Sequence, residues 1–264
     1  MKLTYRISDI VPYINWAYFY HAWGLSGKPE KEKQQLRNEA EVLLQDMEGQ
    51  HHTFALFEIM DANSEGDDII VNNVHIPMLR QQKPMQEDDT CLCLSDFIRP
   101  LSLGIKDQIG VFATTVDSSM EHEHKGDHYL QMMTQTLADR LAEATAEKMH
   151  EEVRIKYWGY SPDEQLSMEQ LHGEMFQGIR PAVGYPSMPD TSVNFILSDL
   201  IGMKQIGITL TETGMMRPHA SVSGLMFAHP QARYFDLGTI GEDQLRDYAT
   251  RRGLPIELIR RFIK

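Results

Sequence analysis

Cysteine and surplus positive charge are what this sequence most clearly lacks. Its 264 residues contain two cysteines, Cys91 and Cys93, and 25 basic against 38 acidic side chains, giving a formal net charge of −13. We interpret the cysteines as small buried side chains rather than a disulfide, a metal pair or a nucleophile, which fits a reducing compartment. The acidic balance argues against nucleic acid as a partner, because a phosphate backbone is bound by basic surfaces.

Long apolar runs and several well-known catalytic patterns are also missing. No run approaches the roughly 20 apolar residues of a membrane-spanning helix, and the N-terminal residues lead into no signal-peptide core. The sequence contains no G-x-S-x-G, no P-loop and no G-x-G-x-x-G. We therefore expect a cytoplasmic protein with no membrane partner, and these patterns assign it no catalytic residue.

Helical and strand periodicities are both present, and they do not alternate regularly along the chain. Apolar spacing and end signals predict helices at residues 26–48, 127–157 and 195–206, one beginning at the capping box 167–170, and two short ones on either side of 253–255. Period-two patterns predict strands at residues 53–60, 69–71, 91–98, 109–115, 221–228 and 234–237. This order favours an α+β fold with an antiparallel sheet over a parallel α/β fold.

Glycine and proline are concentrated in residues 178–190, whose sequence is GIRPAVGYPSMPD. Proline excludes a helix here and pushes each preceding residue toward extended backbone, so we expect a stiff loop whose backbone polar groups are unpaired and available to a ligand. Arg180 offers a planar fork for a carboxylate and Tyr185 an aromatic face for a cation, a combination that suits a zwitterionic ligand. Composition alone, however, favours a proline-rich connector with an exposed arginine.

Residues 178–190 resemble the signature loop of the S-adenosylmethionine-binding activation domain of cobalamin-dependent methionine synthase, and they are termed the signature loop below. Further segments resemble parts of the same family in the same order, so that the resemblance covers nearly the whole chain: residues 13–16 (YINW), 137–144 (LADRLAEA), 157–160 (YWGY) and 220–224 (ASVSG). It implies an α+β domain built around a central antiparallel sheet with long helices. We expect a single domain over residues 1–264, with residues 1–50 as a helical segment that packs onto it.

The resemblance also implies where S-adenosylmethionine binds. Family members place ligand-contacting carboxylates at the positions of Glu143 and Glu174. On spacing alone, Glu143 belongs to an acidic line with Asp139 and Glu147 that is typical of a solvated helix face. The full set of expected ligand contacts is Asn15, Glu143, Glu174, Arg180, Pro181, Ala182, Gly184, Tyr185, Tyr234 and Phe235.

Two positions depart from the family pattern. Asn15 stands where family members often carry an aspartate that contacts the amino group of the ligand, so this contact should be weaker. Thr191 stands where a histidine usually lies on the side toward the cobalamin. The second departure puts the corrinoid contact more in question than the binding of S-adenosylmethionine.

Residues 121–128, with the sequence EHEHKGDH, contain the residue types that ligate metals. Their spacing matches no recognised metal site, and a charged loop before the long helix explains them equally well. We therefore expect no metal in this protein.

The function that the resemblance implies is reactivation of B12-dependent methionine synthase, in which S-adenosylmethionine is bound while cob(II)alamin is reductively methylated. The sequence lacks Asp-x-His-x-x-Gly, the cobalt-ligating pattern of cobalamin modules, so a partner module is expected to hold cobalamin. A flavodoxin-like or other reductase is the second expected partner, with Lys28, Lys31, Lys33 and Arg37 as candidate contacts. The chain alone should bind without turnover. The alternative is a regulatory or binding protein that kept the fold and ligand pocket but lost the corrinoid partner.

Overall fold

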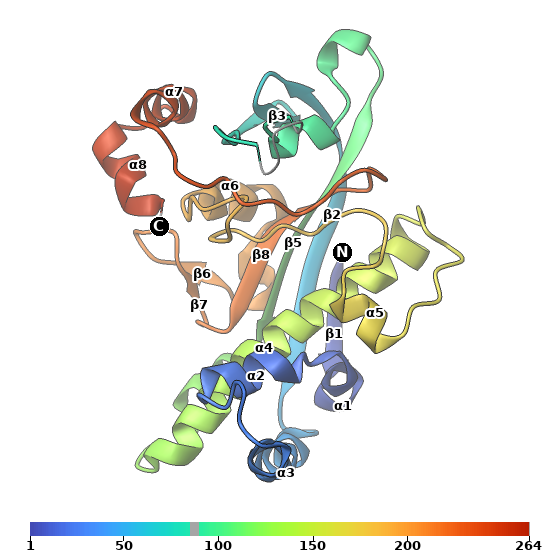
Figure 1. Ribbon diagram of the computed structural model, residues 1–264, viewed down its shortest axis with the longest axis vertical. Helices are drawn as coiled ribbons and strands as arrows, with labels where there is room; N and C mark the ends of the chain where they lie inside the picture. Colours follow the sequence, from blue (N-terminus) through green and yellow to red (C-terminus); the bar gives the residue numbers. More distant parts are fainter. Residues whose placement is uncertain (85–89, 264) are drawn as a thin grey trace.

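The structure is a computed structural model that describes residues 1–84 and 90–263. Within these residues the centre is a six-stranded sheet with the strand order β4–β3–β2–β5–β8, and β1 pairs with β2 outside this path. Every pair in the sheet is antiparallel. The expected α+β fold with a central antiparallel sheet and long helices is confirmed (Figure 1).

The elements of the chain have the following bounds. The strands of the central sheet are β1 (Lys2–Arg6), β2 (His52–Glu65), β3 (Asp68–Val71), β4 (Val74–Pro77), β5 (Asp107–Val116) and β8 (Ser221–Met226), and a separate pair is formed by β6 (Thr209–Leu210) and β7 (Met216–Arg217). The α-helices are α1 (Ile7–Ile10), α2 (Trp16–Ala22), α3 (Glu30–Met47), α4 (His128–Glu152), α5 (Met168–His172), α6 (Val193–Ile201), α7 (Glu242–Arg252) and α8 (Ile256–Phe262). None of the helices within residues 1–84 and 90–263 is both long and apolar enough to cross a membrane.

Strand β2 organises the sheet because its length lets it pair with three other strands. Its first half pairs with β1, its last four residues pair with β3, and most of its length pairs with β5. Side chains alternate between the two faces along such a strand. Leu56 and Met60 therefore belong to one buried cluster, whereas Ala55 and Phe57 belong to another.

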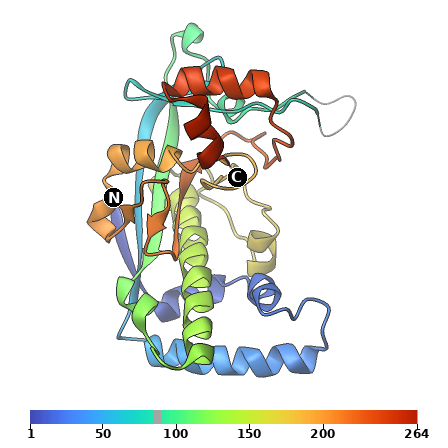
Figure 2. The same ribbon diagram turned by 90° about the vertical axis from the view of Figure 1, so that its left-hand side faces the viewer.

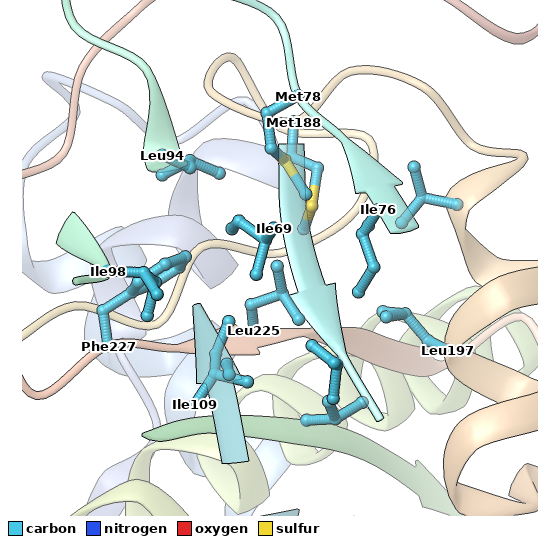
Figure 3. Close-up of a cluster of buried hydrophobic side chains, with 14 of the residues drawn as sticks. Ile69, Ile76, Met78, Leu94, Ile98, Ile109, Met188, Leu197, Leu225 and Phe227 are labelled. Carbon is cyan, nitrogen blue, oxygen red and sulfur yellow. The ribbon is translucent and has the colours of Figure 1, made fainter. Parts of the chain in front are cut away.

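The two clusters form cores on opposite faces of the sheet. One face is covered by α4 together with the N-terminal helices, and Leu137 and Leu141 of α4 are fully buried in it. Figure 2 shows α3 lying across one end of α4, with α7 and α8 at the other end of the molecule. The second core holds Leu197 of α6 and Ile259 of α8, and Met188 of the signature loop points into it beside Met78 (Figure 3).

Two of the predicted strands are wrong. Residues 91–98 contain a 3₁₀ turn at Leu94–Phe97 instead, because the Asp96 carboxylate accepts the Cys93 N–H at 2.8 Å and so favours a local turn. Residues 234–237 pair with no strand. There the Asp236 carboxylate accepts a hydrogen bond from the N–H of Gly238 at 2.7 Å, and the N–H of Leu237 donates to the carbonyl of Pro186.

Other differences concern boundaries. The first 50 residues are not wholly helical, because Lys2–Arg6 is a strand of the central sheet. The long helix changes to a π-helix at Val153–Tyr157. The helix expected over 195–206 stops at Gly202, whose φ of 69° ends α6, and a 3₁₀ turn continues to Gly207. Both cysteines are free, and Cys93 is buried as expected, whereas Cys91 is only partly buried. Burial raises the pKa of the Cys93 thiol to about 11.

Candidate functional site

The signature loop lies along β8 as an irregular extension of the sheet. Ile179 and Phe227 exchange two backbone hydrogen bonds of 3.0 and 2.9 Å, and the N–H of Leu225 donates to the Pro181 carbonyl at 3.1 Å. The expectation that the loop backbone would be unpaired is therefore wrong for these residues. The backbone N–H of Arg180 donates to the Tyr234 hydroxyl at 2.9 Å, and this bond connects the loop to the segment after β8.

Glycines make this close pairing possible. A β-carbon on Gly224 would overlap the Pro181 carbonyl oxygen and would lie 2.9 Å from the Cα atom of Ala182. Gly178 has a φ of 83°, and a β-carbon there would overlap the Phe227 carbonyl. Gly184, with a φ of 89°, turns the chain between Ala182 and Met188 and has open space around it. Two of these glycines thus permit backbone contact, whereas Gly184 only shapes the turn.

A cavity of about 630 Å³ lies between the signature loop, α4, the start of α2 and the end of α5. Nine of the ten predicted contacts line it, namely Asn15, Glu143, Glu174, Arg180, Pro181, Ala182, Tyr185, Tyr234 and Phe235. Gly184 is absent from the lining, since it sits at the outer turn of the loop. Residues more than 200 positions apart are therefore brought to one cavity.

Arg180 is the most enclosed charged group of this lining. Its side chain is 6% exposed, its guanidinium lies 5.5 Å from the ring centre of Phe112, and its Nη2 donates to Oε1 of Glu147. Burial opposes its charge, but Glu147, Tyr234 and Glu143 together raise the pKa of the Arg180 guanidinium. Its Nε is buried and has no hydrogen-bond partner. The cavity wall thus contains a permanent cation with one donor unused.

Carboxylates surround this cation. Glu143 accepts a 2.5 Å hydrogen bond from the Tyr185 hydroxyl, and this carboxylate and burial together raise the pKa of Tyr185. Glu174 stands on the rim with a φ of 55°, a left-handed conformation that costs a residue other than glycine about 1 kcal/mol. Partial burial and the nearby Glu147 raise the pKa of Glu174, while Arg180 lowers it. Glu143 and Glu147 of the acidic line therefore face the cavity, whereas Asp139 lies outside the lining and faces His219.

Aromatic side chains complete the walls. Tyr185 is 49% exposed, and Tyr18 is 62% exposed with the guanidinium of Arg140 5.9 Å from its ring centre. Burial raises the pKa of Tyr234 to about 12, so its hydroxyl stays protonated and can keep its place beside Arg180. Phe235 is 5% exposed and belongs to the core as well as to the cavity wall. The cavity lining therefore combines aromatic faces with the charged side chains of arginines and glutamates.

Asn15 and Thr191, the two departures from the family pattern, differ in their placement. Asn15 lines the cavity, and its side-chain oxygen caps α2 by accepting the N–H of Ala17 at 3.2 Å. Thr191 is 6% exposed, and its hydroxyl lies 2.9 Å from the Thr213 carbonyl and 3.3 Å from the Phe262 carbonyl. The Thr191 side chain is thus held inside the protein, and the position of residue 191 relative to a corrinoid stays a prediction.

Sequence reasoning missed several residues of the lining: Tyr13, Tyr18, Arg140, Ala144, Glu147, Leu171, His172, Pro186, Ser187 and Asp236. Arg140 and Glu147 lie three and four positions from Glu143 on one helix, so helical spacing alone could have found them. The role of Glu147 as partner of Arg180 needed the tertiary structure, because 33 residues separate the two.

Residues 121–128 contribute to a different contact. The carboxylate of Glu123 pairs with Nε2 of His51, and the carboxylate of Glu121 accepts the backbone N–H of His219. Within residues 1–84 and 90–263, no group of three or more His, Cys, Asp or Glu side chains is arranged to hold a metal ion. These acidic side chains tie the segment before α4 to neighbouring parts of the fold.

Comparison with known proteins finds both a matching family and similar solved structures. The family model described as "Vitamin B12 dependent methionine synthase, activation domain" matches residues 6–253. A crystal structure of the MetH reactivation domain bound to AdoHcy is 35% identical in sequence and superposes with a TM-score of 0.92. The aligned region covers 99% of this chain and 88% of that one.

Proposed function

We propose that this chain, which belongs to the activation-domain family of vitamin B12-dependent methionine synthase, binds S-adenosylmethionine and supports reductive reactivation of that enzyme. The similar MetH reactivation domain holds AdoHcy, the demethylated form of the same ligand. The observation that carries the proposal is the convergence of nine expected contact residues on one cavity. A family resemblance without this convergence would support the fold alone.

The cavity suits such a ligand in size and chemistry. Its volume of about 630 Å³ lies within the range of about 300–1,000 Å³ that is typical of small-molecule sites. Tyr18 and Tyr185 offer flat faces to an adenine ring or a sulfonium, and the unused Nε of Arg180 offers a donor to a carboxylate. The residues present therefore fit a ligand that carries an aromatic base, a cationic centre and an amino-acid group.

Six of the ten predicted contacts receive a role in this proposal. Arg180 binds the ligand carboxylate, and Tyr185 and Tyr234 pack against the ligand. Glu143, Glu174 and Asn15 face the amino group and the sulfonium, because carboxylates in a partly desolvated cleft attract cations strongly. S-adenosylmethionine supplies the methyl group when bound. The residues of this chain then orient the methyl group and need no general base, so positioning is their contribution.

The family implies association with the cobalamin-binding module of methionine synthase, which holds the corrinoid. We further propose a flavodoxin-like or other reductase as electron donor. The candidate contacts for this reductase are Lys28, which lies before α3, and Lys31, which lies on α3, and both are exposed. Arg37 is already paired with Glu41 and stacked on Trp16. We place this reaction in the reducing cytoplasm, where free cysteines such as Cys91 persist. We also propose that residues 1–264 act as one domain.

The alternative is a regulatory or binding protein that kept the fold and ligand pocket but lost the corrinoid partner. Its motive in the sequence is Thr191, which stands where family members usually carry a histidine. The burial of Thr191 is compatible with both functions.

Calorimetric titration of S-adenosylmethionine into the purified chain tests the proposal. We expect saturable binding with one ligand per chain and no consumption of the ligand. A second measurement adds the cobalamin module and a reductant, and we expect methylcobalamin to form only when this chain is present. Absence of binding at millimolar ligand would refute the proposal at its first step.

A further inference from the structure

We propose that Glu147 controls recognition of the amino-acid end of the ligand by competing for Arg180. This inference rests on the function proposed above, because it concerns the same cavity. It assigns a specificity-determining role to a residue that the expected contact set does not contain. The starting point is that Arg180 already has a carboxylate partner before any ligand binds.

The competition follows from the geometry of the guanidinium. An arginine binds a carboxylate side-on through two parallel donors, Nε and Nη2. In this structure Nη2 donates to Oε1 of Glu147, whereas Nε is buried without a partner. Glu147 therefore fills half of the fork. A ligand carboxylate can take both donors only when Glu147 gives up Nη2.

Glu147 is the more accessible partner of the ion pair. Its side chain is 25% exposed and lines the cavity, whereas the side chain of Arg180 is 6% exposed and lies over the Phe112 ring. On ligand binding, Glu147 therefore moves toward the cavity space while Arg180 keeps its place.

The released carboxylate would meet charges of both signs. Glu143 lies one helical turn away from Glu147, and Glu147 already raises the pKa of Glu174. In an empty cavity, the carboxylates of Glu143 and Glu174 would therefore repel a Glu147 carboxylate that has left Arg180. A ligand ammonium or sulfonium removes this cost, because it places a cation among the carboxylates. Binding thus becomes an exchange of partners, in which Arg180 takes the ligand carboxylate and Glu147 takes a ligand cation.

An exchange of this kind needs a zwitterion. A cationic ligand without a carboxylate cannot displace Glu147, and it meets an arginine that is already neutralised. The Glu147–Arg180 pair is therefore the feature that recognises the α-carboxylate of the ligand. The relevant quantity is the ratio between the affinities for S-adenosylmethionine and for its decarboxylated analogue, which keeps the sulfonium and the amino group.

Calorimetric affinities for these two ligands test the inference in the wild type and in Glu147→Gln. The variant keeps the shape but weakens the bond to Nη2, since a charge-assisted hydrogen bond is roughly twice as strong as a neutral one. We expect the affinity ratio to rise about fivefold in the variant, a change on the order of 1 kcal/mol. The lost negative charge weakens the contacts to the sulfonium and the amino group that both ligands share, but it also relieves a repulsion of the carboxylate that only S-adenosylmethionine carries. A merely structural defect cancels in the ratio.

Glu143→Gln is the matched control, because Glu143 lies one turn away on α4 and accepts a hydrogen bond from Tyr185 instead of pairing with Arg180. Its affinity ratio measures the loss of a cavity carboxylate that does not pair with Arg180, and it should rise less than the ratio of Glu147→Gln. If Glu147→Gln does not fold, Glu147→Ala measured in the same way should raise the ratio further. A ratio in folded Glu147 variants that is unchanged, lower or no higher than that of Glu143→Gln overturns the inference. If the wild type binds neither ligand, the proposed function itself has failed.

Discussion

Gly224 of β8 lies directly against Pro181 of the signature loop, with no space for a side chain between the two backbones. This contact holds the loop on the sheet and thereby places Arg180 at the cavity. We expect Gly224→Ala to lower the free energy of unfolding by about 3 kcal/mol, because the new methyl group would force the strand and the loop apart. Chemical denaturation with urea measures this loss.

Gly184→Ala is the control for that substitution. Gly184 has a positive φ, unlike Gly224, and nothing lies within 4 Å of the position that a β-carbon would take. Only the backbone conformation is then unfavourable, at about 1–2 kcal/mol. Equal losses for the two alanine variants would show that the contact between Gly224 and Pro181 does not hold the loop.

Arg180→Ala should weaken binding of S-adenosylmethionine by at least about tenfold. The substitution removes hydrogen bonds to a charged group, which are worth about 1.5–3 kcal/mol each. It should also lower the free energy of unfolding, because Glu147 loses its partner. Titration calorimetry and urea denaturation measure the two effects separately.

Lys28→Ala provides the comparison for Arg180→Ala. Lys28 is exposed and lies outside the cavity lining, and exposed charges contribute between zero and about 1 kcal/mol. Affinity and stability should both stay close to those of the wild type. If the two variants bind S-adenosylmethionine equally well, Arg180 does not anchor the ligand carboxylate.

Asn15→Asp should tighten binding of S-adenosylmethionine by about fivefold. Aspartate caps a helix as well as asparagine does, so α2 should keep its N-terminal hydrogen bond from Ala17. The added charge faces a cationic ligand, and a charge-assisted hydrogen bond exceeds a neutral one by about 1 kcal/mol. Titrations at low and high salt check this, since screening should reduce the gain. Unchanged or weaker affinity would remove Asn15 from the ligand contacts.

Glu174→Gln should stabilise the ligand-free protein at neutral pH. Partial burial and Glu147 raise the pKa of Glu174, so the folded state favours the protonated form. The stability linked to this group is therefore complete at acid pH and is lost as the pH rises through the raised pKa. Glutamine cannot ionise and avoids this loss. Because Glu174 is exposed on the rim, the gain at pH 7 should stay below about 1 kcal/mol.

Thermal unfolding at pH 7 and pH 4 checks the sign of this effect. The midpoints of the wild type and Glu174→Gln should converge at the lower pH, where the wild-type carboxyl is largely protonated. The same variant should bind S-adenosylmethionine more weakly at pH 7, because it lacks a charge beside the ligand cation. A stability difference that grows on acidification would contradict the assigned direction of the pKa shift.

The sequence by itself determined the fold class, the long elements and most of the site. Helices α3 and α4 and the strands β2, β5 and β8 carry periodic apolar patterns, and these patterns predicted the type of each element correctly. The resemblance of the signature loop and of the segment around Glu143 identified nine residues that the structure places around one cavity. The strands predicted from local patterns at residues 91–98 and 234–237 were wrong, because the side chains of Asp96 and Asp236 accept hydrogen bonds from nearby backbone N–H groups there.

Only the tertiary structure decided the state of the charges. An acidic line along a helix has the same sequence whether it meets water or a buried guanidinium, so the pairing of Glu147 with Arg180 could not be read from spacing. The loop backbone is a second case, since its pairing with β8 depends on Gly224, which lies more than 40 residues away from Pro181. Burial and long-range contact arise only when distant segments meet, and they set both the competition for Arg180 and the enclosure of Thr191.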